Sequence, residues 1–460
     1  MNRRLLSILL VLAITIEIFS LVTYITSFWR DIGFFVISGI IIWIGWRRPA
    51  VVGYIMVGEL LLGGKGYLFF ASVFGQTISI RQAIFFVATV LAIRQYRRSP
   101  VDWRLIWSRF RWPILLGAWI IMASGWGLFQ GYPIGRVFLD MNAYIFLLAW
   151  PVIYLLWRGR DHREVLFHII AAAAIILALK SWILVVLFGQ DYSWLTSVYR
   201  WVRNTGVGEI VPINSDIMRV FMQSQVYGAL AIWIWLERWR SGKASKTVMW
   251  VAAATCFLIM VSLSRSFWVG TAAAAIVYMA MTIRTWRTYA RLWPFALSVF
   301  IALGAYSWAV NFPYPLPSQG DSTIRTAVTS RLRSTGSADA ATARQNQLEP
   351  LLSEIKKNPI VGRGFGAEAR YFSTDPRVRG WRTTSAFELG WLDTWLKIGL
   401  IGVGLTLSWM VQIARSAPVV ARRWVIPSLV ALVVIHAFTP YINHPLGLGW
   451  LLLLSWPEYE

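Results

Sequence analysis

Apolar residues along this 460-residue chain come in long blocks separated by short polar connections. The blocks hold about 20 residues each and lack the alternation of strands or the one-sided period of amphipathic helices, which is typical of membrane spans. We therefore predict an all-α polytopic membrane protein with fourteen transmembrane helices, twelve being the alternative count. The predicted spans are approximately 5–28, 32–46, 50–64, 81–96, 113–130, 142–157, 165–188, 219–236, 248–263, 267–283, 293–311, 388–413, 424–440 and 443–457. Residues 66–78 are also apolar and form a candidate re-entrant piece.

The composition supports membrane insertion. Hydrophobic residues make up 57% of the chain and charged residues only 14%, against about 25% charged in soluble domains. A large soluble core would have to cover apolar runs such as 169–179 and 429–435 on every side, which we disfavour. The N-terminus resembles a signal peptide, but its apolar stretch is too long and no small-residue cleavage site follows, so we expect it to remain as the first span. The lone Cys256 indicates no disulfide framework.

The positive charges indicate the topology. The net charge of +23 does not gather on one soluble surface, so we expect no nucleic-acid partner. Instead, Lys and Arg concentrate in alternate connections, which the positive-inside rule assigns to the cytoplasm together with both termini. Residues 98–112 are either an amphipathic helix on the inner surface or an ordinary cytoplasmic loop.

One polar segment is far longer than the other connections. Residues 311–387 separate the N-terminal spans, 1–310, from the C-terminal spans, 388–460, and face outward in this topology. Within the segment we predict a helix over 344–357 despite Pro350, followed by a glycine-rich turn over 358–366. Chemistry on a polar substrate is expected in this segment.

Several arginines lie on the outer side, where the positive-inside rule does not place them. An arginine held against membrane helices is costly unless it is paired or binds an anion, and guanidinium groups match phosphate oxygens well. We therefore predict an outward site for a diphosphate, with headgroup-touching or exposed arginines as the alternative reading. The arginines concerned are Arg219, Arg265, Arg331, Arg344, Arg363 and Arg382, with Arg333, Arg370, Arg377 and Arg379 in the same segment.

The candidate base is Glu388, at the outer start of the span that follows the long segment. A carboxylate there could take a proton from a sugar hydroxyl, and the alternative is a helix-terminal Glu favoured by the helix dipole. Asp393, five residues on, is expected on another face. Weaker candidates within or beside spans are Glu17, Glu59 and Lys180. The four histidines have no metal-ligand spacing and the glycines at 362–366 follow no nucleotide-binding strand, so we predict no metal and no cofactor.

The order of these features resembles a known family. A Ser264-Arg265 turn is followed by the long outer segment with Arg331 and Arg344, then by Asn-Pro-Ile-Val-Gly-Arg-Gly-Phe-Gly at 358–366 and Glu-Leu-Gly-Trp-Leu-Asp-Thr-Trp-Leu-Lys-Ile-Gly-Leu-Ile-Gly at 388–402. This is similar to the O-antigen ligase and O-antigen polymerase superfamily, whose core carries Ser-Arg-Gly, Pro-(Ile/Leu)-x-Gly-x-Gly and His-Asn…Gly-Leu-x-Gly stretches. The resemblance covers mainly residues 219–402.

The resemblance implies a C-type glycosyltransferase-like membrane fold without a metal. It implies action on an undecaprenyl-diphosphate-linked glycan donor and a glycan acceptor at the outer face of the bacterial inner membrane, and the lipid bilayer and other polysaccharide-assembly membrane proteins as partners. The two arginines required in the ligases correspond to Arg265 and Arg344. Their histidine is replaced within Ser385–Glu388, which favours a polymerase over a ligase and makes Glu388 the expected base. A lipid-linked glycan flippase is the third reading, disfavoured because polarity is concentrated in one outer segment rather than at mid-membrane depth.

Overall fold

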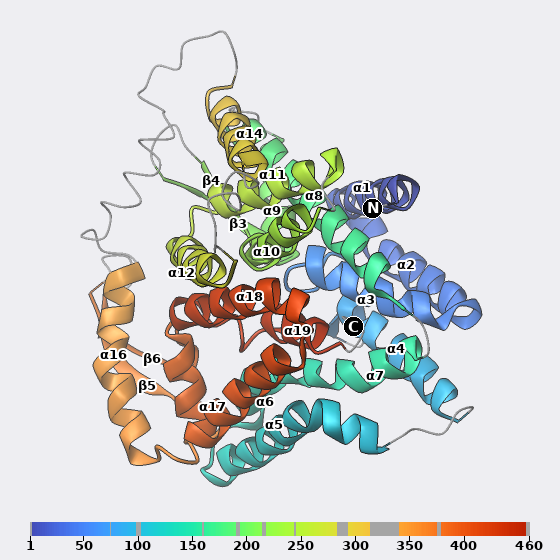
Figure 1. The fold of residues 1–460 in the computed structure, drawn as a ribbon. Coiled ribbons are helices and arrows are strands. Elements are labelled where there is room, and N and C mark those ends of the chain that lie inside the picture. The colour runs from blue at the N-terminus through green and yellow to red at the C-terminus, as the bar shows by residue number, and fades with distance from the viewer. Residues whose placement is uncertain are drawn as a thin grey trace. The chain divides into compact units, whose positions relative to one another are not determined.

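The computed structural model describes residues 2–73, 75–97, 103–158, 161–189, 194–213, 218–242, 245–282, 293–312, 340–374 and 379–456. The chain divides into two compact units, each described by itself. The first unit comprises Met1–Pro100, Trp150–Thr271 and Ala275–Thr329, and the second comprises Val101–Ala149, Ala272–Ala274 and Ser330–Glu460. Most of the residues in both are helical (Figure 1).

The first unit is a helical bundle with two β-hairpins. Its elements are α1 (Arg3–Ile25), α2 (Ser27–Arg47), α3 (Pro49–Leu62), β1 (Phe70–Val73), β2 (Gln76–Ser79), α4 (Ile80–Tyr96), nearly all of α7 (Ala149–Trp157), α8 (Arg163–Phe188), α9 (Leu195–Asn204), β3 (Gly208–Pro212), β4 (Met218–Met222), η2 (Gln223–Gln225), α10 (Val226–Arg240), α11 (Lys246–Val261), most of α12 (Arg265–Thr282) and α14 (Trp293–Val310).

Helix α8 lies at the centre of the first unit and packs against α1, α3, α11 and α14. Its four consecutive alanines, 171–174, are all buried, and small side chains of this kind let neighbouring membrane helices approach closely. Local signals fix the helix starts: Ser79 and Gln82 form a capping box at the start of α4, and Ser245 caps α11.

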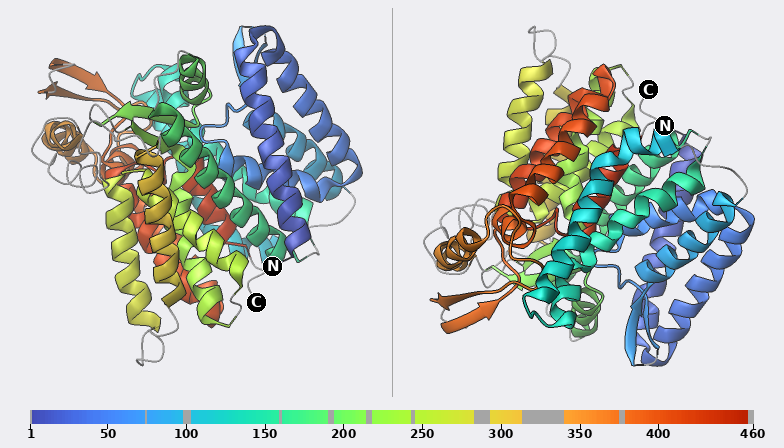
Figure 2. Two further views of the ribbon diagram at one scale, coloured as in Figure 1. Left: turned by 90° about the horizontal axis from the view of Figure 1, so that it is seen from above. Right: turned by 90° about the horizontal axis from the view of Figure 1, so that it is seen from below.

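The second unit contains α5 (Trp103–Phe129), α6 (Ile134–Met141), η1 (Asn142–Leu148), α16 (Ala340–Lys357), β5 (Ala369–Ser373), β6 (Gly380–Thr384), α17 (Gly390–Ser416), α18 (Val419–Phe438) and α19 (Pro445–Leu454). Helix α17 packs against α5, α16, α18 and α19. The β5–β6 hairpin lies beside α16 in both views of Figure 2, where its two strands are the orange arrows.

A small apolar core joins α16 and β5 to α17. Its buried members are Leu351, Ile355, Ala367, Ala369, Phe387 and Leu396. Because these residues come from α16, β5, α17 and the connections that precede β5 and α17, burial of one apolar surface fixes these segments together. The described C-terminal part of the long polar segment is thereby anchored to α17.

The helical membrane architecture agrees with the prediction, but the number of spans is not confirmed. A helix overlaps each of the fourteen predicted spans. By length and composition, seven helices in the described part of the chain could cross a membrane: Arg3–Ile25, Trp29–Arg47, Ile106–Phe129, Ile134–Trp157, Arg163–Phe188, Gly390–Ser416 and Val419–Phe438. Four more apolar helices are shorter: Pro49–Leu62, Lys246–Val261, Phe295–Val310 and Pro445–Leu454.

Three local predictions were wrong. The fold is not purely α, because three antiparallel two-stranded sheets are present, one of which, β1–β2, overlaps the apolar stretch 66–78. Arg219 does not open a helix but lies in β4, where it pairs with Val211 of β3. The described part of the segment 98–112, from Trp103 onward, is helical but does not end before the span: it continues into the span as α5, with Pro113 inside the helix.

Candidate active site around a broken membrane helix

Helix α17 is interrupted in its middle at Gly399. This residue has φ of 66° and ψ of −177°, while the residues on both sides belong to the helix. A backbone break of this kind leaves amide and carbonyl groups without their helical partners, which a membrane interior tolerates only where other protein groups satisfy them.

The glycine-rich turn satisfies the groups that the break exposes. The amides of Arg363 and Gly364 donate to the carbonyl oxygens of Leu396 and Lys397, at 2.7 and 3.0 Å. In the opposite direction, the amides of Leu400 and Ile401 donate to the carbonyl oxygens of Pro359 and Ile360, at 3.0 and 3.2 Å. The Trp119 indole of α5 donates to the remaining carbonyl, that of Ile398, at 2.7 Å. The turn and the helix therefore exchange backbone hydrogen bonds in both directions.

Two glycines permit this close approach. A Cβ atom on Gly399 would lie 2.1 Å from the carbonyl oxygen of Ile360, and one on Gly362 would lie 2.5 Å from the amide nitrogen of Gly399. Both residues also have positive φ, 66° and 83°, which only glycine adopts readily. The Gly-rich stretch that carries part of the family resemblance thus has a structural explanation: it is the partner of the broken helix.

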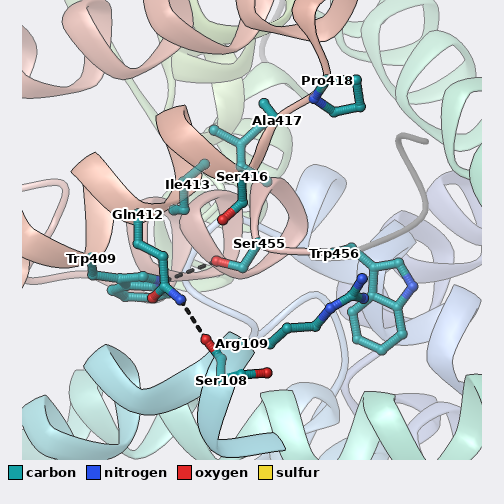
Figure 3. A pocket seen from close by; sticks show the side chains of 11 residues that line it. Ser108, Arg109, Trp409, Gln412, Ile413, Ser416, Ala417, Pro418, Ser455 and Trp456 are labelled. Atoms are coloured by element: carbon teal, nitrogen blue, oxygen red, sulfur yellow. Dashed lines mark hydrogen bonds between the residues drawn. The ribbon is translucent and has the colours of Figure 1, made fainter. Parts of the chain in front are cut away.

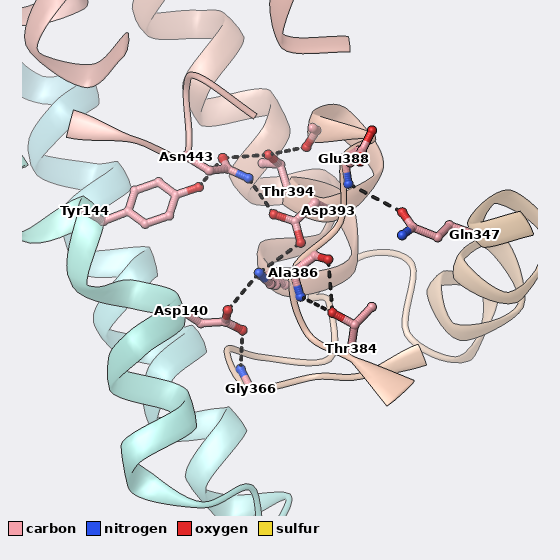
Figure 4. Close-up of polar contacts among 12 residues, drawn as sticks. Asp140, Tyr144, Gln347, Gly366, Thr384, Ala386, Glu388, Asp393, Thr394 and Asn443 are labelled. Carbon is pink, nitrogen blue, oxygen red and sulfur yellow. Dashed lines mark hydrogen bonds and ion pairs between the residues drawn. The ribbon is translucent and has the colours of Figure 1, made fainter. Parts of the chain in front are cut away.

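Three charged side chains are buried at the part of α17 that precedes the break, and Figure 4 labels two of them, Asp140 and Asp393. The Lys397 ammonium lies 3.1 Å from a carboxylate oxygen of Asp140 and 2.9 Å from one of Asp393. The three side chains are exposed by only 7, 9 and 6%, respectively. The second Asp140 oxygen accepts a hydrogen bond from the amide of Gly366, at 2.9 Å. We call Asp140, Lys397 and Asp393 the buried charge cluster.

Polar side chains at the start of α19 complete the surroundings of Asp393. Asn443 donates to Asp393 at 2.8 Å, and its amide oxygen accepts hydrogen bonds from Tyr144 at 2.6 Å and Thr394 at 2.9 Å. His436 of α18 is fully buried, lies 3.2 Å from the Thr394 hydroxyl and accepts from the amide of Ile442 at 3.1 Å. The polar groups of four separate helical segments thus converge here.

The structure brings two of the three predicted catalytic residues together. Arg344 of α16 forms an ion pair with Glu388, with 3.1 Å between guanidinium and carboxylate. Glu388 stands two residues before α17, and its backbone amide faces the side-chain oxygen of Gln347 at 3.5 Å. The carboxylate side chain is 47% exposed and the arginine 29%, so both groups are accessible to a substrate.

The surroundings tune the Glu388 carboxyl in two directions. Burial raises the pKa of this carboxyl, and the positive charge of Arg344 opposes that shift. The pKa remains above its ordinary value. A carboxylate with a raised pKa is a stronger base, which suits a residue that must take a proton near neutral pH.

The predicted substrate-binding arginines occupy different environments. Arg363 forms an ion pair with Glu354 of α16, which also pairs with Lys357 at 2.7 Å. Arg382 lies in β6 opposite Tyr371 of β5. Arg331 lies outside the described residues. Their roles in binding stay predictions.

Arg219 and Arg265 both belong to the first unit, where a tight turn separates α11 from α12. Arg219 donates to the carbonyl oxygen of Ser262 in this turn at 2.8 Å and lies over the ring of Phe221, 4.6 Å from its centroid. Leu263 adopts a left-handed conformation with φ of 46°, and Arg265 is the first residue of α12. A non-glycine residue in this conformation is strained. The Arg219 hydrogen bond stabilises this strained turn, which directly precedes Arg265.

The weaker candidates form ion pairs within the first unit. Glu17 lies 2.7 Å from Lys180, and Glu59 makes two hydrogen bonds with Arg81, at 2.7 and 3.0 Å. These pairs join α1 to α8 and α3 to α4, so a structural role is sufficient for them. Within the described ranges, no group of three or more His, Cys, Asp or Glu side chains could hold a metal ion.

Sequence reasoning missed the buried charge cluster. Asp140 lies in the short connection between the predicted spans 113–130 and 142–157, and Asp393 is expected on another face than Glu388. The readable signal was the spacing of Asp393 and Lys397, which puts opposite charges on one face of an apolar helix.

A pocket of about 290 Å³ lies at the other end of α17 (Figure 3). Arg109 and Trp456 line it, and Gln412 donates to the carbonyl oxygen of Ser108 at 2.9 Å. Gln412 follows Gly399 by 13 residues, which is about 20 Å along a helix. In the predicted topology this end faces the cytoplasm, so we do not include the pocket in the outward site.

Comparison with known families confirms the resemblance found in the motifs. Residues 247–407 match the family model described as O-antigen ligase. Members of this family are membrane enzymes of the glycosyltransferase type. The matched range includes Arg265, Arg344 and Glu388, as well as the glycine-rich turn and the break at Gly399. A search of curated proteins and a search of solved structures each found no match, and the C-type glycosyltransferase-like fold stays a prediction.

Proposed function

We propose that this protein is a membrane glycosyltransferase that polymerises lipid-linked oligosaccharide repeat units into a surface polysaccharide. The observation that carries the proposal is the Arg344–Glu388 ion pair, positioned within the segment that matches the O-antigen ligase family. It pairs a cation suited to a diphosphate with a carboxylate suited to a sugar hydroxyl.

The proposed reaction exchanges one bond at the anomeric carbon. The acceptor hydroxyl of one lipid-linked repeat attacks the anomeric carbon of a second, from the side opposite the diphosphate. A new glycosidic bond forms, the bond from the anomeric carbon to the diphosphate oxygen breaks, and the configuration inverts. The acceptor proton passes to the Glu388 carboxylate, and undecaprenyl diphosphate leaves. Arg265 and Arg344 stabilise the charge that develops on the diphosphate, and Arg219, Arg331, Arg363 and Arg382 contribute to substrate binding.

The side of the membrane follows from the distribution of positive charge. The start of α17 and Glu388 face outward if the arginine-rich connections, such as the one with Arg422 and Arg423, face the cytoplasm. The enzyme would then act at the outer face of a bacterial inner membrane with both termini inside. This agrees with a substrate that is presented on the outer leaflet by its lipid carrier.

A ligase is the second candidate function, favoured by the description of the matching family. It would use the same donor and the same residues but another acceptor. The replacement of the family's histidine by the stretch ending in Glu388 favours the polymerase.

The two candidates are separated by incubating the purified protein with undecaprenyl-diphosphate-linked repeat units, alone and with a foreign glycan acceptor. A ladder of longer products from the repeats alone supports the polymerase, and transfer only to the foreign acceptor supports the ligase. If neither product forms, the proposal is refuted, and transport of the lipid-linked glycan is the remaining candidate function.

Variants test the proposed roles in the same assay. Arg265→Ala should leave expression intact while chain length collapses to single repeats. The matched control is Arg200→Ala, which removes an exposed arginine of α9 and should retain wild-type ladders. Long chains from the Arg265→Ala variant would contradict its role at the diphosphate.

A further inference from the structure

The buried charge cluster has a composition that stability alone does not favour. Two carboxyl groups share one ammonium group, so the cluster holds more acidic than basic groups while its side chains are almost inaccessible to solvent. Buried ion pairs are often less stabilising than apolar side chains of the same size, and ionisable residues inside membrane spans are costly. A cluster of this kind requires a reason beyond packing.

Lys397 is the point where the segments around the break meet. Its side chain binds Asp140 of α6 and Asp393 one turn earlier in α17. Its carbonyl oxygen accepts the amide of Gly364, and Asp140 in turn accepts the amide of Gly366. The glycine-rich turn is therefore held at two of its amides, one by Lys397 itself and one by the carboxylate that Lys397 neutralises.

Both residues of the proposed catalytic pair are tied to these segments. Glu388 lies five residues before Asp393, and the amide of Asp393 donates to the carbonyl oxygen of Leu389 at 2.8 Å. Arg344 belongs to α16, which leads directly into the glycine-rich turn. A second ion pair, Arg136 with Glu368 at 2.8 Å, joins α6 to the residues just after the turn. The position of Arg344 relative to Glu388 thus depends on how α6, α17 and the turn are held together.

We propose that Lys397, with Asp140 and Asp393, is a positioning residue for glycosyl transfer, and that its two ion pairs hold the Arg344–Glu388 pair in its reactive arrangement. This inference rests on the proposed function. Directional charged contacts suit the task because they fix distances and angles that apolar packing leaves looser. A small displacement caused by a change remote from the reacting atoms can lower a rate about 100-fold.

The test uses the full-length protein in detergent or nanodiscs with the polymerisation assay described above. Asp140→Asn leaves the neutral Lys397–Asp393 pair in place and is expected to fold. It should lower kcat at least tenfold and change KM for the lipid-linked repeat less than threefold, because the arginines that bind the diphosphate remain. Lys397→Met should lower kcat about 100-fold. Lys356→Met, the same substitution at an exposed lysine of α16, should retain wild-type kcat.

A triple variant separates positioning from stability. Asp140→Asn, Asp393→Asn and Lys397→Met together leave no charge in the cluster, so the melting temperature should recover relative to Lys397→Met alone. If kcat stays low in this variant and in Asp140→Asn while both melt like wild type, positioning is supported. If kcat is at the wild-type level in either folded variant, or recovers together with the melting temperature, the inference is overturned. A wild-type protein that forms no product would instead refute the proposed function itself.

Discussion

Replacing Gly399 by alanine should disrupt the second unit more than any other single methyl addition in α17. The residue has φ of 66° with ψ of −177°, a region that non-glycine residues enter at a cost of about 1–3 kcal/mol. The new Cβ would also lie 2.1 Å from the carbonyl oxygen of Ile360. The glycine-rich turn would have to move away.

Movement of the turn weakens the four backbone hydrogen bonds that cross between it and α17. At about 0.5–1.5 kcal/mol each, these contribute about 2–6 kcal/mol. Together with the backbone strain, the expected loss of unfolding free energy is about 3–9 kcal/mol, a large fraction of the total for an ordinary folded protein.

The assay is thermal unfolding of the purified protein in detergent, followed by the amount of monodisperse protein that remains after heating. Gly404→Ala is the matched control, since it adds the same methyl group to the same helix, where no atom lies within 4 Å of the new Cβ. It should melt at or slightly above the wild-type temperature, because alanine favours a helix over glycine by about 0.5–1 kcal/mol. If Gly399→Ala melts like Gly404→Ala, the turn does not stabilise the broken helix and the reasoning fails.

Three further predictions concern charged groups. In a profile of reaction rate against pH, the midpoint of the acid limb should lie above the ordinary carboxyl range, since burial raises the pKa of Glu388. Arg344→Gln should move this midpoint to still higher pH, because the opposing positive charge is lost. An unchanged midpoint in this variant would exclude Glu388 as the titrating base. A carboxyl whose pKa is raised in the folded state contributes stability below its unfolded pKa that is lost as the pH rises through its folded pKa, so Glu388→Gln should be inactive yet melt no lower than wild type at neutral pH. Glu59→Gln should lower the unfolding free energy by about 3–5 kcal/mol by leaving buried Arg81 uncompensated, and the double change with Arg81→Met should recover part of that loss in a thermal melt.

The helical architecture was predictable because membrane spans must be long, apolar and internally hydrogen-bonded. The hairpins were not, since strands of four or five residues carry a weak pattern. The β4 strand had a readable signal: Val220 and Met222 are buried and alternate with Arg219 and Phe221. Because the neighbouring α10 is mostly apolar, the alternation in β4 was read as part of the same span, which was therefore predicted to begin at residue 219.

The pairing of Arg344 with Glu388 could be expected only in part. Each residue was identifiable by its charge and place in the chain, but their 3.1 Å contact depends on α16 packing back onto the start of α17. The break at Gly399 was even harder to predict from the sequence. A glycine within an apolar helix ordinarily costs only about 1 kcal/mol, and nothing in its neighbours in sequence shows that a turn 33 residues earlier supplies their missing partners.

The reciprocal bonding at Gly399 makes two distant stretches of sequence interdependent. Residues 359–364 and 396–401 each supply donors to the other and accept from it, so neither has a complete set of backbone partners alone. A chimera that takes only the turn, or only the helix, from a related enzyme would combine two stretches whose backbone groups do not match. Grafting both stretches together is the exchange that such engineering should make.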